Sequence, residues 1–198
     1  MMKSTIEYYL GSLGIADSSS KQEKLLREII LSNRSENEIL LDFEKFILSQ
    51  NQLSSDTILI IKRSLLCGYS YEDCGLGGDD NVFKSQLFSR FINHFPNIPN
   101  FKFDYAECCM MNNQPVEDYF SVLKEGMMQD KEHKFYFTSE LICSIHESSF
   151  NFEFDILLLE KYYQPCDKES FDEYVQEFKE MYKSEEQQKY LNNLKQNL

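Results

Sequence analysis

The chain of 198 residues has no tryptophan, and it has only seven glycines, four prolines and three histidines. So little glycine and proline argues against long flexible linkers, and a hydrophobic fraction of 42% argues against wholesale disorder. The longest strictly apolar runs are four residues, as in Ile58–Ile61, whereas a membrane-spanning helix needs about 20. The N-terminal segment also lacks the charged start, apolar stretch and cleavage site of a secretion signal. These absences predict a single domain over residues 1–198, located in the cytoplasm.

Basic charge is scarce as well. There are 20 Lys and Arg against 33 Asp and Glu, which leaves a formal net charge of −13 at pH 7. The imbalance is uneven, because residues 1–100 hold 13 acids and 10 bases while residues 101–198 hold 20 acids and 10 bases. Such a chain is repelled by phosphate backbones and anionic membranes, which argues against direct binding to nucleic acid or lipid. Solubility explains part of the charge, and a basic protein partner is the other explanation.

The six cysteines are too few for a disulfide scaffold, and no Cys-x-x-Cys pair occurs. We therefore expect free thiols at Cys67, Cys74, Cys108, Cys109, Cys143 and Cys166. A zinc site built from Cys74, Cys166 and His94 or His146 is the weaker alternative. The histidines, His133 among them, show no spacing typical of paired metal ligands or of a nucleophile and its base. The sequence thus predicts no catalytic residue, no metal and no cofactor, and it does not indicate an enzyme.

Residues 1–97 have the apolar spacing of about five amphipathic helices. The first is expected to begin near Ser4 and the second to span residues 21–32. Ser35 followed by Glu38 predicts a capping box at the start of the third. Asp56 and Asp80 are the expected caps of the fourth and fifth.

Beyond Pro99 the apolar period changes to two, which is typical of strands. Alternation is found over residues 101–108, 133–145 and 150–157. Pro115 is expected at a helix start, and residues from Cys166 onward are expected to form one long helix. The prediction is an α+β fold, in which the helical half, about residues 1–97, packs on a small antiparallel sheet in the half over about residues 98–198. An all-α fold is the alternative, because residues 139–145 and 156–163 also suit helices.

The Gly-rich segment over residues 68–80 lacks the Gly-Lys-Ser/Thr of a phosphate loop, and its acids repel phosphate. One interpretation is a loop between helices that ends in a capping Asp80. The other is an exposed recognition loop, whose tyrosines supply contact area and whose carboxylates pair with basic residues of a partner. The candidate partner-binding residues are Tyr69, Tyr71, Glu72, Asp73, Asp79 and Asp80.

Residues 167–186 form the second candidate surface. On a helix, one side holds the apolar residues Phe171, Tyr174, Val175, Phe178 and Tyr182. The opposite side holds Glu169, Glu173 and Glu180, flanked by Glu177. Like charges four residues apart cost about 0.2–0.5 kcal/mol per pair in an isolated helix. A solvated face is the alternative, but an acidic stripe kept despite this cost predicts a basic surface opposite it.

In charge, aromatic content and lack of a catalytic motif, the chain resembles the small cytosolic immunity proteins of bacterial toxin systems, such as those of contact-dependent inhibition toxins. The resemblance is one of character and carries over no site. It implies a non-catalytic inhibitor that neutralises a basic toxin domain, with a nuclease as one candidate. The alternatives are an acidic regulator that mimics nucleic acid, of the kind found in phage or defence systems, and an enzyme of unrecognised type. The oligomeric state is left open.

Overall fold

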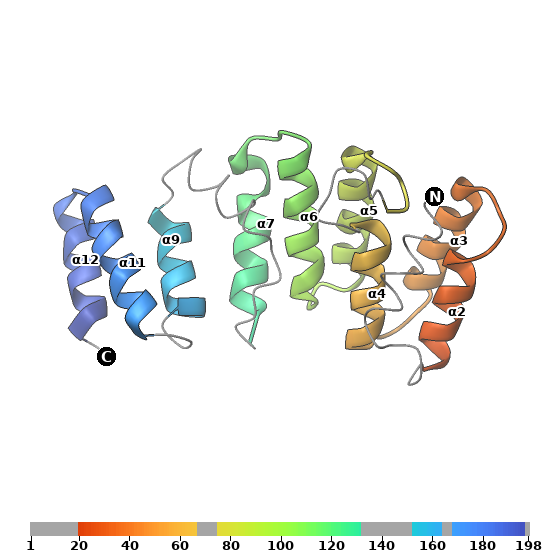
Figure 1. Ribbon diagram of the computed structural model, residues 1–198, viewed down its shortest axis with the longest axis horizontal. Coiled ribbons are helices and arrows are strands. Elements are labelled where there is room, and N and C mark those ends of the chain that lie inside the picture. Colours follow the sequence, from red (N-terminus) through yellow and green to blue (C-terminus); the bar gives the residue numbers. More distant parts are fainter. Residues whose placement is uncertain (1–19, 67–74, 132–151, 164–167, 197–198) are drawn as a thin grey trace.

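The computed structural model describes residues 20–66, 75–131, 152–163 and 168–196, and within these ranges it contains nine α-helices, one π-helical segment and no strand. The helices stand side by side in a row, with α2 and α3 at one end and α11 and α12 at the other (Figure 1). In chain order they are α2 (Lys21–Ile30), α3 (Glu36–Leu48), α4 (Ser55–Leu65), α5 (Asn81–His94), α6 (Pro99–Met111), α7 (Val116–Gln129), α9 (Phe152–Leu158), the π-helical segment η1 (Leu159–Tyr163), α11 (Lys168–Met181) and α12 (Glu185–Gln196).

The predicted sheet is wrong for the described residues. Residues 101–108 lie inside α6, and residues 152–157 lie inside α9. The third predicted strand, over residues 133–145, lies outside the described residues. The described part of the chain is all-α, so the α+β prediction is replaced by its all-α alternative.

The error at α6 has a physical cause, which is that this helix is buried on two opposite sides. Phe101 and Cys108 pack into a first apolar cluster with α2 to α5. Phe103, Ala106 and Cys109 pack into a second cluster with α7 and α9. A helix with two apolar sides shows no single stripe, and its aromatic residues fall by chance at the spacing of a strand.

The same explanation holds for α9. Phe154, Leu157 and Leu158 belong to the second cluster, whereas Ile156 belongs to the third, together with Leu159 of η1. The third cluster is completed by residues of α11 and α12. Apolar cores therefore follow one another along the row, and α6 and α9 each contribute to two of them.

In residues 1–97, four of the five predicted helices are present, and the one expected near Ser4 lies outside the described residues. The capping box of Ser35 and Glu38 is confirmed. The predicted cap at Asp56 is wrong, because the Ser54 hydroxyl accepts the hydrogen bond from the Thr57 amide at 3.1 Å and begins α4. Asp56 lies in the first turn instead, where its negative charge interacts favourably with the helix dipole. None of the described helices is both long enough and apolar enough to cross a membrane.

The predicted long C-terminal helix is also wrong, because the chain breaks it into α11 and α12. Ser184 starts α12: its hydroxyl accepts a hydrogen bond from the Gln187 amide at 3.2 Å and donates one to Gln187 Oε1 at 2.7 Å. This reciprocal pair of hydrogen bonds is a local signal that marks the end of α11 and the start of α12. Pro115, by contrast, directly precedes α7 as predicted.

Candidate functional site

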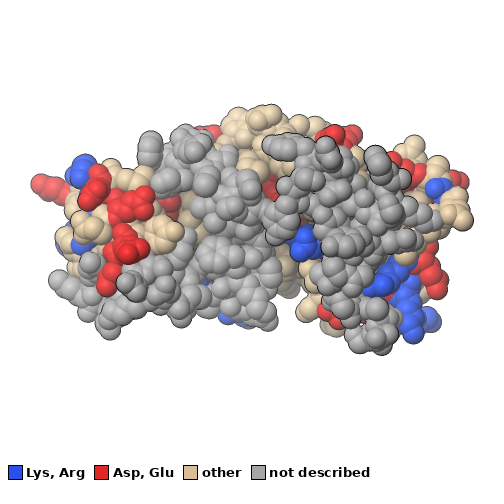
Figure 2. All heavy atoms as spheres, in the orientation of Figure 1, with Lys and Arg blue, Asp and Glu red and all other residues tan. Residues whose placement is uncertain are grey.

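The acidic stripe predicted in residues 167–186 lies on α11 and faces solvent. Glu173, Glu177 and Glu180 are all exposed, and we call these three residues the acidic face. Figure 2 shows Asp and Glu side chains gathered at this end of the row, where α11 and α12 lie. Glu169 belongs to the first turn of the same helix, but its side chain lies outside the described part.

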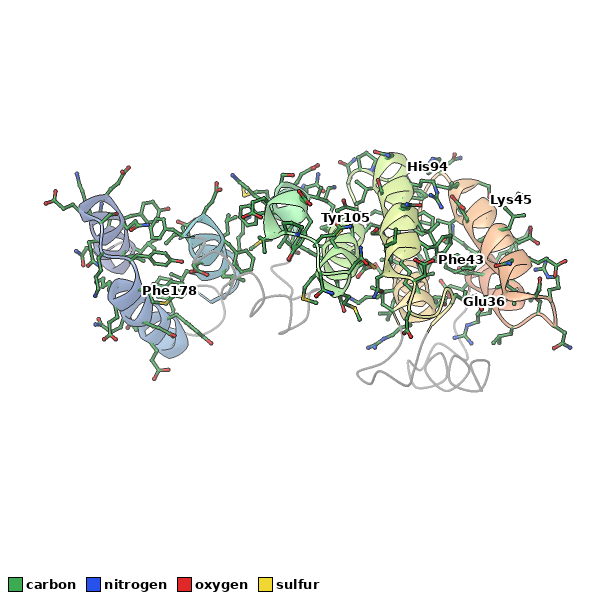
Figure 3. All side chains as sticks on the ribbon, turned by 90° about the horizontal axis from the view of Figure 1, so that it is seen from above. Glu36, Phe43, Lys45, His94, Tyr105 and Phe178 are labelled. Carbon is green, nitrogen blue, oxygen red and sulfur yellow. The ribbon has the colours of Figure 1, made fainter. Side chains whose placement is uncertain are left out.

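The opposite side of α11 is buried, which confirms the predicted amphipathic pattern. Phe171, Val175, Phe178 and Tyr182 are at most 6% exposed. Phe178 lies on the side of α11 that faces α9 (Figure 3). Because this apolar side is held against the rest of the protein, the acidic face is turned outward.

No ion pair with another described residue neutralises the acidic face. Glu173 and Glu177 are four residues apart, so their carboxylates repel each other across one helical turn. Lys183, which follows α11 in the chain, donates a hydrogen bond to the Lys179 carbonyl at 3.2 Å. The carboxylates of the acidic face are thus available for pairing with a cation from another molecule.

The second candidate surface is described only in part. Tyr69, Tyr71, Glu72 and Asp73 lie outside the described residues, whereas Asp79 and Asp80 are exposed. The Asp80 carboxylate accepts a hydrogen bond from the Phe83 amide at 2.8 Å, so its predicted role as the cap of α5 is confirmed.

The glycines of this segment anchor it to the neighbouring helices. A side chain at Gly75 would lie 2.6 Å from the Ser64 carbonyl oxygen, so the close approach to α4 requires glycine. The Gly77 amide donates to Glu36 Oε1 at 2.7 Å, and its φ of +87° favours glycine as well. Residues 75–80 therefore have a structural role in joining α3, α4 and α5.

The described residues of the two candidate surfaces do not lie together. Asp79 and Asp80 lie at the start of α5, and α6, α7 and α9 stand between that helix and α11 (Figure 1). A partner of ordinary size binds one patch rather than scattered residues along a whole row. The acidic face of α11 places three exposed carboxylates on one side of one helix and is the candidate site.

Two tyrosine hydroxyls connect α11 and α12 to carboxylates of α9 and η1. The Tyr182 hydroxyl donates to Asp155 Oδ2, and both side chains are buried. The Tyr190 hydroxyl donates to Glu160 Oε1 at 2.6 Å near the surface. Burial, followed by the hydrogen bond to Asp155, raises the pKa of Tyr182 far above its usual value. The hydrogen bond to Glu160 and then burial raise the pKa of Tyr190 to about 12.

We expect the stability that these two hydrogen bonds contribute to be lost at alkaline pH. A tyrosine ionises near pH 10 in the unfolded chain but at higher pH in the folded one, so the unfolded state loses protons first and stability falls as pH rises above about 10. Tyr182 alone contributes up to about 1.4 kcal/mol per pH unit in that range. Urea unfolding followed by circular dichroism at about pH 8, 10 and 11 measures the decline. It should be less steep in Tyr182→Phe, and an equal slope in both proteins would contradict the assignment.

A group of three charged side chains, one fully buried and two half-buried, joins α4 to α6. Lys62 Nζ lies 2.9 Å from Asp104 Oδ1 and 3.7 Å from Glu107 Oε2. The Asp104 side chain is only 1% exposed. Burial raises the pKa of Asp104, and Lys62 offsets part of that rise. Burial lowers the pKa of Lys62, but the two carboxylates outweigh this and the net shift is upward, so the ammonium persists.

These charged side chains and the Tyr182–Asp155 pair were not anticipated from the sequence. Asp104 lies in the segment 101–108, for which a strand is predicted, and its position among aromatic residues is the only local hint of burial. Tyr182 was placed correctly on the apolar side of α11. A buried tyrosine needs a hydrogen-bond partner for its hydroxyl, and that is the signal from which a buried acceptor could have been inferred.

The thiols and histidines that are described offer no reactive arrangement. Cys108 and Cys109 are free and buried in α6, and burial raises the pKa of both. His94 lies in the last turn of α5, with Nε2 3.2 Å from the Gln50 carbonyl oxygen. Within the described ranges, no three His, Cys, Asp or Glu side chains are grouped so that they could hold a metal ion.

The acidic face is therefore the arrangement best suited to recognition: open carboxylates on a rigid helix, able to pair with Lys or Arg of another molecule. Neither a protein-family model, nor a curated protein, nor a solved structure matches this chain.

Proposed function

We propose that the protein is a non-catalytic binding protein that recognises a basic protein partner through the acidic face of α11. The observation that carries the proposal is the exposure of Glu173, Glu177 and Glu180 on one side of a helix whose other side is buried. The helical backbone holds these three carboxylates at fixed spacing on one side, which lowers the entropy lost on binding.

The charge of the whole chain supports the same partner. The net charge of −13 attracts a basic protein over a distance of several ångströms and speeds the encounter. Contacts at the acidic face then fix the register of the complex. The narrower form of the proposal is an immunity protein that covers the cationic cleft of a bacterial toxin domain, for which a nuclease is one candidate.

We expect the variant with Glu173, Glu177 and Glu180 all replaced by Gln to lose binding at least tenfold. A carboxylate that is desolvated and paired in an interface costs about 2–5 kcal/mol when it is lost. The fold should remain equally stable, because Gln keeps size and helix propensity and removes the repulsion between Glu173 and Glu177. The measurement is the dissociation constant and association rate for the basic protein that the tagged chain retrieves from its source cells at stoichiometric yield.

A matched control removes the same three charges elsewhere. Glu28, Asp56 and Glu117 are exposed on α2, α4 and α7, and their amide variant has the same net charge as the α11 variant. It should bind the partner with only a small loss in association rate. Equal binding by both variants at low salt would mean that the charge serves solubility alone. Equal weakening of both would assign the effect to net charge and not to the acidic face.

A further inference from the structure

The pair formed by α11 and α12 lies at the end of the row of described helices, and the two helices contact each other (Figure 1). Gln188 Nε2 donates to the carbonyls of Lys179 at 2.7 Å and Tyr182 at 2.5 Å, which joins the start of α12 to the end of α11. Leu191 of α12 is fully buried in the third cluster beside the aromatic side of α11. The two helices therefore share both polar and apolar contacts.

Among the described residues, the cluster that attaches them to the neighbouring elements is small. In the described residues the third cluster has seven buried side chains, whereas the first has fifteen. The ring of Phe152 lies edge-on to Tyr182 and Tyr190, with centroids 4.9 and 6.1 Å away. In proteins whose elements stack in a row, each unit is stabilised mainly by its nearest neighbours, so an end unit with a small interface opens most easily.

Within the described part of that interface, the Tyr182–Asp155 hydrogen bond is a buried polar contact. It joins α11 to α9, and both residues are at most 6% exposed. A hydrogen bond to a charged group is among the stronger ones in proteins, and more so where water is excluded. Breaking it while the interface opens requires both groups to be hydrated again.

We propose that α11 and α12 open from α9 and η1 as one unit, at a lower free energy than global unfolding. The Tyr182–Asp155 hydrogen bond is the contact that controls this opening. Opening exposes Phe171, Phe178 and Tyr182 and releases the orientation of α11 relative to the row. The inference does not depend on the proposed function, because it concerns the interface behind α11 and not its acidic face.

The test is native-state hydrogen exchange of the full chain, followed by mass spectrometry of peptides from α11, α12, α5 and α6. In the unaltered protein, amides of α11 and α12 should exchange at similar rates, faster than those of α6, and with a weaker dependence on urea, because a smaller surface is exposed when they open. Tyr182→Phe should accelerate exchange in α11 and α12 about tenfold or more, since one hydrogen bond to a charged group is lost. Exchange in α5 and α6 should not change.

Tyr190→Phe is the matched control, because it removes a hydroxyl–carboxylate bond of the same kind at the surface, and it should have a smaller effect. The proposal is overturned if α11 and α6 exchange equally slowly with the same urea dependence, which would place both in one cooperative unit. It is also overturned if Tyr182→Phe leaves α11 and α12 unchanged or accelerates α6 equally. The urea dependence needs no variant, so the test holds even if a substituted chain folds poorly.

Discussion

Replacing Lys62 with methionine is expected to lower the free energy of unfolding by about 3–5 kcal/mol at pH 7. Methionine keeps the length of the side chain but removes the ammonium that faces two carboxylates. The fully buried Asp104 then keeps a charge without compensation, and ionising it in an apolar surrounding is costly. Urea unfolding of the substituted and unaltered proteins measures the difference.

Two controls separate the missing charge from lost packing. In the double variant Lys62→Met with Asp104→Asn, most of the stability should return, because no unpaired charge is left between α4 and α6. The cost of Lys62→Met alone should shrink as the pH is lowered, since Asp104, whose pKa burial raises, then takes up a proton in the folded state. A cost within about 0.5 kcal/mol, typical of a surface residue, would contradict the role of this pair.

Replacing Phe101 with alanine is expected to cost about 3–5 kcal/mol. Phe101 is fully buried at the contact between α5 and α6. Its ring centroid lies 6.2 Å from that of Phe88, 5.4 Å from Phe91 and 6.1 Å from Phe95. Alanine leaves a cavity among three rings that cannot all move in to fill it. Thermal and urea unfolding give the loss of stability.

Leu41→Ala is the control for Phe101→Ala, because Leu41 is 52% exposed on α3. Its substitution should change stability by about 0.5 kcal/mol or less. The comparison also tests the assignment of residues 101–108. Phe101 on a strand at the edge of a small sheet would contact fewer rings, and its loss would cost less than the value expected for α6.

The candidate site was predictable from the sequence to a large extent, because one helix contains nearly all of it. The alternation of Phe171, Val175 and Phe178 with Glu173 and Glu177 has the period of a helix with one buried side. That pattern needs no knowledge of the neighbours, and the structure confirms which side is buried. The end of α11 was missed, although Ser184 and Gln187 form the same kind of local cap that was recognised at Ser35 and Glu38.

By itself the sequence determined the four described helices before residue 97, the amphipathic pattern of α11 and the acidic charge, since each depends on side chains within a few turns of one another. Only the tertiary structure decided that residues 101–108 and 152–157 are helical. Each of these helices lies between two apolar clusters, so its sequence has two buried sides and resembles a strand. The burial of Asp104 was also decided in three dimensions, because its countercharge, Lys62, comes from another helix and no local pattern contains both.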